Sequence, residues 1–422
     1  MNEEQNIKQL PKGWKWVKLG DVCHTTSGGT PSRRELKYYN GNIPWVKSGE
    51  LDRGLITDTE EKISEEAIKN SSAKVFPKGT LLIALYGATI GKLAFLGVDA
   101  ATNQAICGIY KNENISSPFL YNYLFYKKRK LVGQGIGGAQ PNISQTILKN
   151  LDLPLPPIPT QLAIVSKIEE LFSELDKGIE NLRTAQQQLK TYRQSVLKWA
   201  FEGKLTNENV KDGELPKGWK WGRLGDVCNK IQDGSHFSPQ MQYDEPGKNR
   251  FKYITAKNIR NDYMDFRKVT YVDKDFHDSI YGRCNPEFGD VLLTKDGINT
   301  GEVTLNTLHE PFSLLSSVCI FKTKKKDLRS EFLKYFIQSP FGSKAILDSM
   351  TGTAIKRIVL RKIKDSEIVL PTIEEQLNVI LEIESRLSVA DKMEESITQS
   401  LLQAEALRQS ILKKAFEGKL VG

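Results

Sequence analysis

Two stretches of the chain carry apolar residues at every seventh position, which is the pattern of a coiled-coil helix. The first seam contains Ile168, Leu175, Leu182, Leu189 and Val196, and the second contains Ile383, Ala390, Ile397, Ala404 and Ile411. Further apolar residues lie between them at Leu171, Phe172, Ile179, Ala185, Tyr192, Leu387, Met393, Leu401 and Leu407. We therefore expect two long helices whose seams can pair with each other.

Each of these helices is predicted to span about 45 residues and therefore roughly 65 Å. That is longer than a globular domain of about 150 residues can cover, so part of each helix must bridge to another element. Prolines in "LPLPPIPTQ" from Leu153 precede the first helix, and "AFEGKL" ends both helices, with Gly203 and Gly418 as stop signals. The alternative is that each helix packs only on its own domain.

The two remaining regions have mixed patterns. Short apolar runs such as "LLIAL" and "SVCIF" indicate strands, and amphipathic stretches that begin at Ser117 and Ser330 indicate helices. We predict an α+β chain in which long helices join two similar α/β globular domains. The predicted segments are 1–154 for the first domain, 155–205 for the central helix, 206–369 for the second domain and 370–422 for the distal helix.

This organisation is duplicated within the chain. "LPKGWKWVKLGDVC" at Leu10 returns as "LPKGWKWGRLGDVC" at Leu215, and "RQSVLKWAFEGKL" at Arg193 returns as "RQSILKKAFEGKL" at Arg408. The chain is thus two unequal copies of one unit, an internal repeat. We expect the tryptophans of the repeated opening phrase to pack in the domain cores, namely Trp14, Trp16, Trp219 and Trp221.

Composition and charge suggest a compartment and a class of partner. The five cysteines are never spaced as CxxC, and neither a signal sequence nor a membrane span is recognisable, which favours a cytoplasmic protein. The chain carries a net charge of +9, whereas segments 160–204 and 372–420 carry +1 and −3, which leaves +11 on the globular regions. This positive charge on the globular regions favours nucleic acid bound by the domains. The alternative is that it is only a surplus of lysine on the surface.

Known catalytic motifs are incomplete in this sequence. "GATIGKL" from Gly87 is one residue short of a phosphate-binding loop, and Leu93 replaces the magnesium-binding Ser or Thr. "NPEF" at Asn285 departs from an amino-methyltransferase motif at Glu287, and the four histidines are far apart. We therefore predict a chain that is not an enzyme and has no metal or cofactor of its own.

The duplicated frame closely resembles the specificity subunit of type I restriction-modification systems. The resemblance covers nearly the whole chain and rests on "LP.GW" at Leu10 and Leu215, "LPP...Q" at Leu155 with its echo at Leu370, the "AFEGKL" endings, and "GGTPSR....YYNGNIPWVKSGEL" from Gly28, from which the second half departs at Gln232. It implies two target recognition domains that each read one half of an interrupted site in double-stranded DNA.

The resemblance also implies partners. The two helices would pack antiparallel, set the spacing between the half-sites and dock two methyltransferase subunits, while restriction and translocase subunits would join through the complex. S-adenosylmethionine, ATP and magnesium are then expected on the partner subunits, and no membrane partner is expected. A runner-up function is a non-catalytic coiled-coil scaffold that binds protein partners.

The predicted DNA contacts lie in loops that differ between the two copies and carry donors and acceptors suited to bases and phosphates. In the first domain they are Thr26, Ser27, Gly28, Gly29, Thr30, Arg33, Arg34, Lys47, Ser48, Tyr86, Thr89, Gln140 and Asn142. In the second they are Gln232, Ser235, His236, Lys257, Asn258, Lys295, Asp296, Asn299, Lys356 and Arg357, with Lys257 and Asn258 taken as counterparts of Lys47 and Ser48.

The two helix endings are candidate docking surfaces for the partner subunits, because nearly the same residues occur at both. The candidate docking residues are Trp199, Phe201, Lys204, Lys414, Phe416 and Lys419. Ordinary helix termination explains the same residues equally well.

Overall fold

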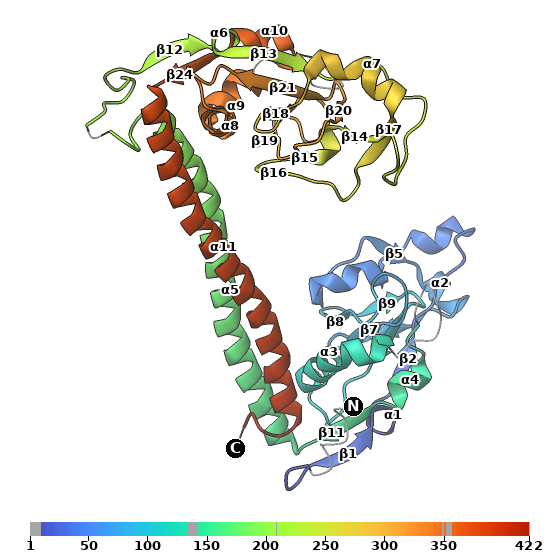
Figure 1. The fold of residues 1–422 in the computed structure, drawn as a ribbon. Helices are drawn as coiled ribbons and strands as arrows, with labels where there is room; N and C mark the ends of the chain where they lie inside the picture. Colours follow the sequence, from blue (N-terminus) through green and yellow to red (C-terminus); the bar gives the residue numbers. More distant parts are fainter. Residues whose placement is uncertain (1–9, 134–141, 208, 348–349, 352–356, 422) are drawn as a thin grey trace. The chain divides into compact units, whose positions relative to one another are not determined.

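The computed structural model describes residues 10–133, 142–207, 209–347, 350–351 and 357–421. The chain divides into two compact units. Unit 1 comprises Met1–Leu182 with Gln399–Gly422, and unit 2 comprises Arg183–Thr398. Each unit therefore contains one globular part together with segments of both long helices (Figure 1).

Unit 1 is built from short strands and helices. Its strands are β1 (Lys15–Lys18), β2 (Thr25–Ser27), β3 (Ile43–Val46), β4 (Leu55–Ile56), β5 (Glu61–Ile63), β6 (Val75–Phe76), β7 (Leu81–Ala84), β8 (Leu93–Leu96), β9 (Ala100–Thr102), β10 (Ile106–Ile109) and β11 (Asp152–Leu155). Its short helices are α1 (Leu19–Val22), η2 (Leu36–Tyr39), η3 (Ser48–Arg53), α2 (Glu65–Lys69), α3 (Ser117–Gly133) and α4 (Gln145–Lys149).

Unit 2 contains a corresponding set. Its strands are β12 (Lys220–Arg223), β13 (Cys228–Asp233), β14 (Arg250–Ile254), β15 (Ile259–Arg260), β16 (Tyr263–Met264), β17 (Thr270–Asp273), β18 (Val291–Thr294), β19 (Val303–Leu305), β20 (Ser313–Leu314), β21 (Val318–Thr323), β22 (Met350–Thr351), β23 (Arg357–Ile358) and β24 (Glu367–Leu370). Its short helices are α6 (Leu224–Val227), η4 (Ala256–Asn258), α7 (Lys274–Cys284), α8 (Ser330–Gln338), α9 (Pro340–Leu347) and α10 (Leu360–Asp365).

The sheets of the two units share one topology. The order β2-β10-β7-β8 in unit 1 matches β13-β21-β18-β19 in unit 2, and β5-β3-β9 matches β17-β14-β20. In each unit the opening phrase forms a strand that pairs with the strand leading into a long helix, β1 with β11 and β12 with β24. Unit 1 adds the edge strands β4 and β6, and unit 2 adds the pairs β15-β16 and β22-β23. The predicted α+β repeat is confirmed.

The long helices α5 (Ile158–Phe201) and α11 (Ile373–Phe416) each have 44 residues and run antiparallel, which confirms the predicted coiled coil. In unit 2, Arg193 forms ion pairs with Asp391 at 2.6 Å and Glu394 at 2.9 Å. In unit 1, Arg408 pairs with Asp176. No helix in the described part of the chain is long and apolar enough to cross a membrane.

The predicted seam is buried most completely where the helices meet the globular parts. Ile168 and Ile411 lie in the core of unit 1, and Val196 and Ile383 lie in that of unit 2. The seam prediction is wrong for three residues, because Tyr192 of α5 is 36 % exposed and Met393 and Leu407 of α11 are 52 % and 51 % exposed. A pair of helices buries only one narrow stripe on each, and these three residues lie outside it.

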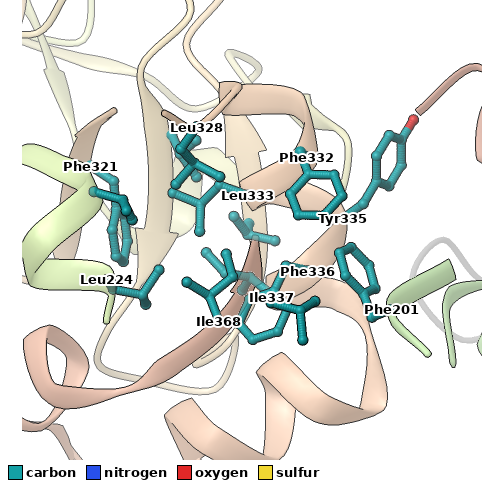
Figure 2. Close-up of a cluster of buried hydrophobic side chains, with 14 of the residues drawn as sticks. Phe201, Leu224, Phe321, Leu328, Phe332, Leu333, Tyr335, Phe336, Ile337 and Ile368 are labelled. Carbon is teal, nitrogen blue, oxygen red and sulfur yellow. The ribbon is translucent and has the colours of Figure 1, made fainter. Parts of the chain in front are cut away.

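The ends of both helices pack into the cores through an aromatic residue. Phe201, at the end of α5, lies beside Phe332 and Phe336 of α8 (Figure 2). Its ring is edge-on to both, with centroid distances of 5.0 and 5.3 Å. Phe416, at the end of α11, makes the same kind of contact with Phe119 and with Tyr123 of α3. Both ends are therefore fixed by the globular part of their own unit.

A buried glutamine explains the "LPP...Q" motif at the start of each long helix. Gln161 is fully buried; its Oε1 accepts from the N–H of Ser116 at 2.8 Å, and its Nε2 donates to the carbonyls of Asn114 and Pro156 at 3.0 and 2.9 Å. Gln376 makes the same three bonds in unit 2, at 2.9, 2.9 and 3.2 Å. The amide thus ties each helix start to the loop before α3 or α8.

The tryptophans of the opening phrase divide into two classes. Trp14 packs against the core of unit 1, and Trp219 is buried in unit 2. Trp16 and Trp221 are 45 % and 55 % exposed, so the expectation that all four lie in the cores was wrong for these two. Trp16 and Trp221 lie within β1 and β12, whereas Trp14 and Trp219 directly precede these strands.

Candidate nucleic-acid interface

The predicted contact loops can be compared between units because both are built on the same sheet. Asp233 occupies in β13 the place that Ser27 occupies in β2, since each lies opposite the cysteine of the central strand. The glycine that follows donates its N–H to that central strand in both units, at 3.1 Å. In the same register, Lys295 is the counterpart of Leu85.

Three residues of the first loop pair are buried, and their prediction as DNA contacts must be corrected. A Cβ added to Gly28 would lie 2.1 Å from Oγ1 of Thr102, and one added to Gly29 would lie 2.4 Å from Ser72, so both glycines serve close backbone packing. Ser235 is 2 % exposed. The other predicted residues of these loops are partly or fully exposed, namely Thr26, Ser27, Thr30, Gln232 and His236.

The second loop pair has one backbone shape and different side chains. Glycines with positive φ lie at corresponding positions of both loops, Gly87 and Gly91 in unit 1 and Gly297 and Gly301 in unit 2. The predicted contacts Tyr86, Thr89, Asp296 and Asn299 are partly exposed between or beside these glycines. Sequence reasoning missed Ile298, which is fully exposed at the tip of its loop. An apolar residue in a short polar loop was the available signal.

The described residues that directly follow the third loop lie beside the start of the second loop in both units. Asn142 is exposed and pairs with Tyr86 in an isolated bridge, and the N–H of Ile143 donates to the carbonyl of Leu85 at 2.8 Å. In unit 2, the N–H of Ile358 donates to the carbonyl of Lys295 at 3.3 Å. The predicted contacts Gln140 and Lys356 lie outside the described residues, and Arg357 is described only as part of β23.

Side chains connect the three loops of unit 1 at one edge of the sheet. Nε2 of Gln145, the first residue of α4 directly after the third loop, donates to Oγ of Ser27 in the first loop at 2.6 Å. Gln104 hydrogen-bonds both Thr30 of the first loop and Tyr86 of the second. Neither glutamine was predicted, because no sequence pattern indicated that the segments carrying them meet these loops.

Two predicted cations of unit 1 are held by carboxylates. Lys47 pairs with Glu60 at 2.8 Å and Glu61 at 3.1 Å, and these hydrogen bonds raise the pKa of its ammonium. Arg33 pairs with Glu61 at 2.6 Å and lies 4.2 Å from the ring centroid of Tyr39. A bound phosphate would therefore compete with these carboxylates. Arg34 is exposed and Ser48 partly exposed.

The predicted match of Lys257 and Asn258 to Lys47 and Ser48 is wrong by two residues. The register of β3 and β14 makes Thr255 the counterpart of Lys47. Asn258 is 2 % exposed, and its Oδ1 accepts from the N–H of Thr255 at 3.0 Å, just as Glu50 caps the helical turn at Lys47. Asn258 is therefore a buried capping residue and not a DNA contact, whereas Lys257 is exposed.

Charged and polar side chains gather at the same edge of unit 2. Lys295 is 8 % exposed and donates to Asp233 at 2.6 Å, so this predicted contact is buried in an ion pair rather than presented to solvent. His236, Gln232 and Arg283 also contact Asp233. Sequence reasoning missed both Asp233 and Arg283. Arg283 comes from α7, 50 residues further along the chain, so the sequence did not indicate that the two side chains meet.

The helix endings present fewer candidate docking residues than predicted. Phe201 and Phe416 are each 3 % exposed, so their assignment as docking residues must be corrected to core residues. Trp199 is 41 % exposed. The predicted lysines Lys204, Lys414 and Lys419 are partly or fully exposed, and two of them pair with carboxylates, Lys204 with Glu202 at 3.0 Å and Lys419 with Glu417 at 2.7 Å.

The cysteines lie in the interior of the units as free thiols. All five cysteines are buried and unpaired, and burial raises the pKa of Cys107 and of Cys228 to about 12, which keeps both as protonated thiols. Within the described residues, no group of three or more His, Cys, Asp or Glu is placed to hold a metal ion.

Comparison with known proteins gives one consistent family. The family model for the type I restriction modification DNA specificity domain matches residues 11–184 and again residues 216–403. Among curated proteins, the type I restriction enzyme MjaIX specificity subunit of Methanocaldococcus jannaschii is 27 % identical over 384 residues, covering 87 % of this chain and 85 % of that protein. The EcoKI specificity subunit of Escherichia coli is 23 % identical over 373 residues, covering 86 % and 79 %.

Solved structures show the same fold. A chain from a study of complex assembly and conformational transition of the type I R-M system matches with a TM-score of 0.75 and 20 % identity, covering 97 % of this chain and 99 % of that one. The HsdS subunit from Thermoanaerobacter tengcongensis matches with a TM-score of 0.59 and 22 % identity, covering 97 % and 98 %.

Proposed function

Because this chain belongs to the family of type I restriction-modification DNA specificity subunits, we propose that each of its units reads one half of an interrupted double-stranded DNA site. Three loops at the sheet edge of unit 1 and the two described loops at that edge of unit 2 supply the contacts. Unit 1 uses Thr26, Ser27, Thr30, Tyr86, Thr89 and Asn142, and unit 2 uses Gln232, His236, Asp296, Ile298 and Asn299. The exposed cations Arg34 and Lys257 contact the phosphates.

One observation carries this proposal: the two units keep the same backbone framework and differ in side chains at equivalent positions of one edge. In the shared sheet register, Tyr86 of unit 1 corresponds to Asp296 of unit 2, and Thr89 corresponds to Asn299. These pairs present different donors, acceptors and apolar groups. Two units that recognise different half-sites need different side chains at these positions, because base identity is recognised from the donor and acceptor pattern in the groove.

We propose that the chain contributes recognition while the chemistry resides on its partners. The exposed residues of the helix endings, Trp199 and Lys414, would dock two methyltransferase subunits, and restriction and translocase subunits would join through that complex. S-adenosylmethionine, ATP and magnesium would then be bound by those partners. The chain supplies affinity and position, which accords with loops rich in hydrogen-bonding side chains.

The decisive experiment exchanges the segment 24–150 for the equivalent segment of another family member. Methylated sites are then mapped across a genome in cells that also express the methyltransferase subunit. We expect one half of the recognised motif to change and the other half to remain. The reciprocal exchange in the second globular region should change the opposite half. A change of both halves by either exchange contradicts the assignment of one half-site to each unit.

A binding assay separates this function from that of a protein scaffold. The chain is mixed with its methyltransferase partner and titrated with duplex DNA at several salt concentrations. Recognition through phosphate contacts predicts that the logarithm of affinity falls linearly with the logarithm of salt concentration. Binding that is indifferent both to DNA sequence and to salt favours the scaffold instead.

The antiparallel pair of long helices suggests how the gap between half-sites is set. A seven-residue insertion near Gln186 of α5, matched by one near Thr398 of α11, preserves the heptad pattern and adds about 10 Å to the helical pair. DNA rises 3.4 Å per base pair, so we expect the gap to widen by about three base pairs. An unchanged gap in the mapped motif refutes this spacing role.

A further inference from the structure

A single buried carboxylate organises the readout edge of unit 2. The side chain of Asp233 is 4 % exposed, accepts hydrogen bonds from three side chains and lies within ion-pair distance of a fourth, His236. Lys295 donates to its Oδ2 at 2.6 Å, and Nε2 of His236 lies 3.1 Å from the same oxygen. Arg283 donates to Oδ1 at 2.7 Å, and Nε2 of Gln232 donates to that oxygen at 3.0 Å. Two side-chain nitrogens therefore lie at each carboxylate oxygen.

These bonds fix Asp233 as the charged anchor of the cluster. Burial opposes the ionised form of Asp233, but the hydrogen bonds from Lys295 and Arg283 outweigh burial and lower the pKa of the carboxyl below its ordinary value. Arg283 is further held by its Nε, which donates to the backbone carbonyls of Asp233 and Gly234 at 2.9 and 3.0 Å. Both side chains are thus locked in one geometry.

Exposure decides which members of the cluster can reach a ligand. The Lys295 side chain is 10 % exposed, whereas those of Arg283 and His236 are 40 % and 58 % exposed. The bonds of Arg283 within the cluster use Nε and Nη2, and among the described residues its Nη1 has no partner. The cluster therefore presents one guanidinium edge and one imidazole to solvent, with at least one positive charge in excess of the carboxylate.

Unit 1 has no such cluster at the corresponding positions. Ser27 replaces Asp233 and Leu85 replaces Lys295 in the same sheet register. Ser27 accepts a hydrogen bond from the neutral amide of Gln145 instead. The anchored cations are therefore a property of unit 2 and not a requirement of the shared fold.

We propose that Asp233 is a positioning residue for DNA recognition by unit 2, holding Arg283 and His236 where they contact the bases or phosphates of its half-site. Asp233 itself does not touch DNA, because it is buried and its oxygens already accept from Lys295, Arg283 and Gln232. Preorganised side chains lose less conformational entropy on binding, and a guanidinium fixed on one edge can donate with the other. This inference rests on the proposed division of the site between the two units.

The test is a double variant that copies unit 1, Asp233→Ser together with Lys295→Leu. Removing both partners avoids leaving a buried unpaired lysine, so the melting temperature should stay within a few degrees of the parent value. The chain in complex with its methyltransferase partner is used to select from a pool of random DNA duplexes. We expect the preference at one or more positions of one half-site to fall about 5- to 150-fold, with the other half unchanged.

Asp244→Asn is the matched control, because it removes an exposed carboxylate from the same unit. It should leave both half-sites unchanged. Arg283→Ala is a second variant that tests the exposed member of the cluster directly and remains informative even if the double variant fails to fold. It should weaken binding and, if the contact is to phosphate, reduce the salt slope by about one.

The outcomes separate this inference from the function on which it rests. If the parent complex enriches no two-part motif, the proposed function fails. If the parent enriches such a motif and the folded double variant selects the same one with equal preference, the positioning role of Asp233 is overturned. Unchanged affinity, preference and salt slope in Arg283→Ala would overturn the role of the cluster even if the double variant does not fold.

Discussion

Replacing Gln161 by leucine removes the amide that ties the start of α5 to the loop before α3, while it keeps a side chain of similar size. Three backbone groups then lose their partner: the N–H of Ser116 and the carbonyls of Asn114 and Pro156. Gln376→Leu makes the same change in unit 2, because its three bonds are equivalent. The two variants therefore form a matched pair, one for each unit.

The size of the effect follows from these contacts. A buried polar group that loses its partner costs about 1–3 kcal/mol, and only part of that cost applies where water can reach the group. Three such groups around the fully buried Gln161 give an expected loss of about 2–5 kcal/mol. For a unit of roughly 200 residues, this corresponds to a fall in melting temperature of about 5–15 °C.

Hydrogen exchange measured by mass spectrometry localises the loss. Gln161→Leu should accelerate exchange in α3 and at the start of α5 and leave α8 unaffected, whereas Gln376→Leu should do the reverse. Gln188→Leu, at an exposed position of α5, is the control and should change stability by less than about 0.5 kcal/mol. If Gln161→Leu has the same melting temperature as the control variant, or if hydrogen exchange in α3 is unchanged, the proposed role of the amide is refuted.

Three further predictions concern the packing and titration of each unit. Phe201→Ala and Phe416→Ala should each cost about 3–5 kcal/mol, the first in unit 2 and the second in unit 1, whereas Trp199→Ala should alter urea unfolding by less than about 1 kcal/mol. Gly418→Ala should destabilise unit 1 in thermal melts, because Gly418 has a φ of 69° and an added Cβ would lie 2.3 Å from Pro11. Gly178→Ala, in open space on α5, should instead stabilise by about 0.5–1 kcal/mol. Burial of His277 lowers its pKa below the ordinary 6.5, so the unfolded state binds the proton more tightly, and unit 2 should lose stability as the pH falls through 6.5 towards the lower folded pKa. Urea midpoints between pH 7.5 and 5 check this loss, and His277→Gln should reduce it.

The repeated frame was predictable because it rests on patterns that sequence alone displays. The heptads of α5 and α11 and the two glycine stops required no knowledge of tertiary contacts. The pattern did not reveal which apolar residues the partner helix covers. Met393 fits the heptad as well as Ile383 does, yet Met393 is exposed and Ile383 is buried in a core. Burial depends on where the globular part meets the helix, which periodicity does not encode.

The candidate site was predictable at the level of loops and not at the level of residues. The loop beginning at Gln232 diverges visibly from its counterpart, but its organising residue, Asp233, reads in sequence as an ordinary turn aspartate. Its partners Arg283 and Lys295 are 50 and 62 residues away in the chain. The misplacement of Asn258 has a related cause, because a capping amide and an exposed amide look alike until the neighbouring strands fix the register.

The sequence repeat and the compact unit are different divisions of this chain, and the difference has a physical consequence. Gly418 ends the second copy, but it packs against Pro11 of the first copy's opening phrase. Gly203 ends the first copy and packs against Pro216 of the second copy's opening phrase. Each unit therefore contains the C-terminal end of the long helix that follows the globular part of the other unit. A change at Phe416 must act on unit 1, although the residue belongs to the second copy, because its ring packs against Tyr123. In both units the opening phrase of one copy contacts the helix ending of the other copy. Because these two contacts are equivalent, the two opening phrases are nearly identical, and so are the two helix endings.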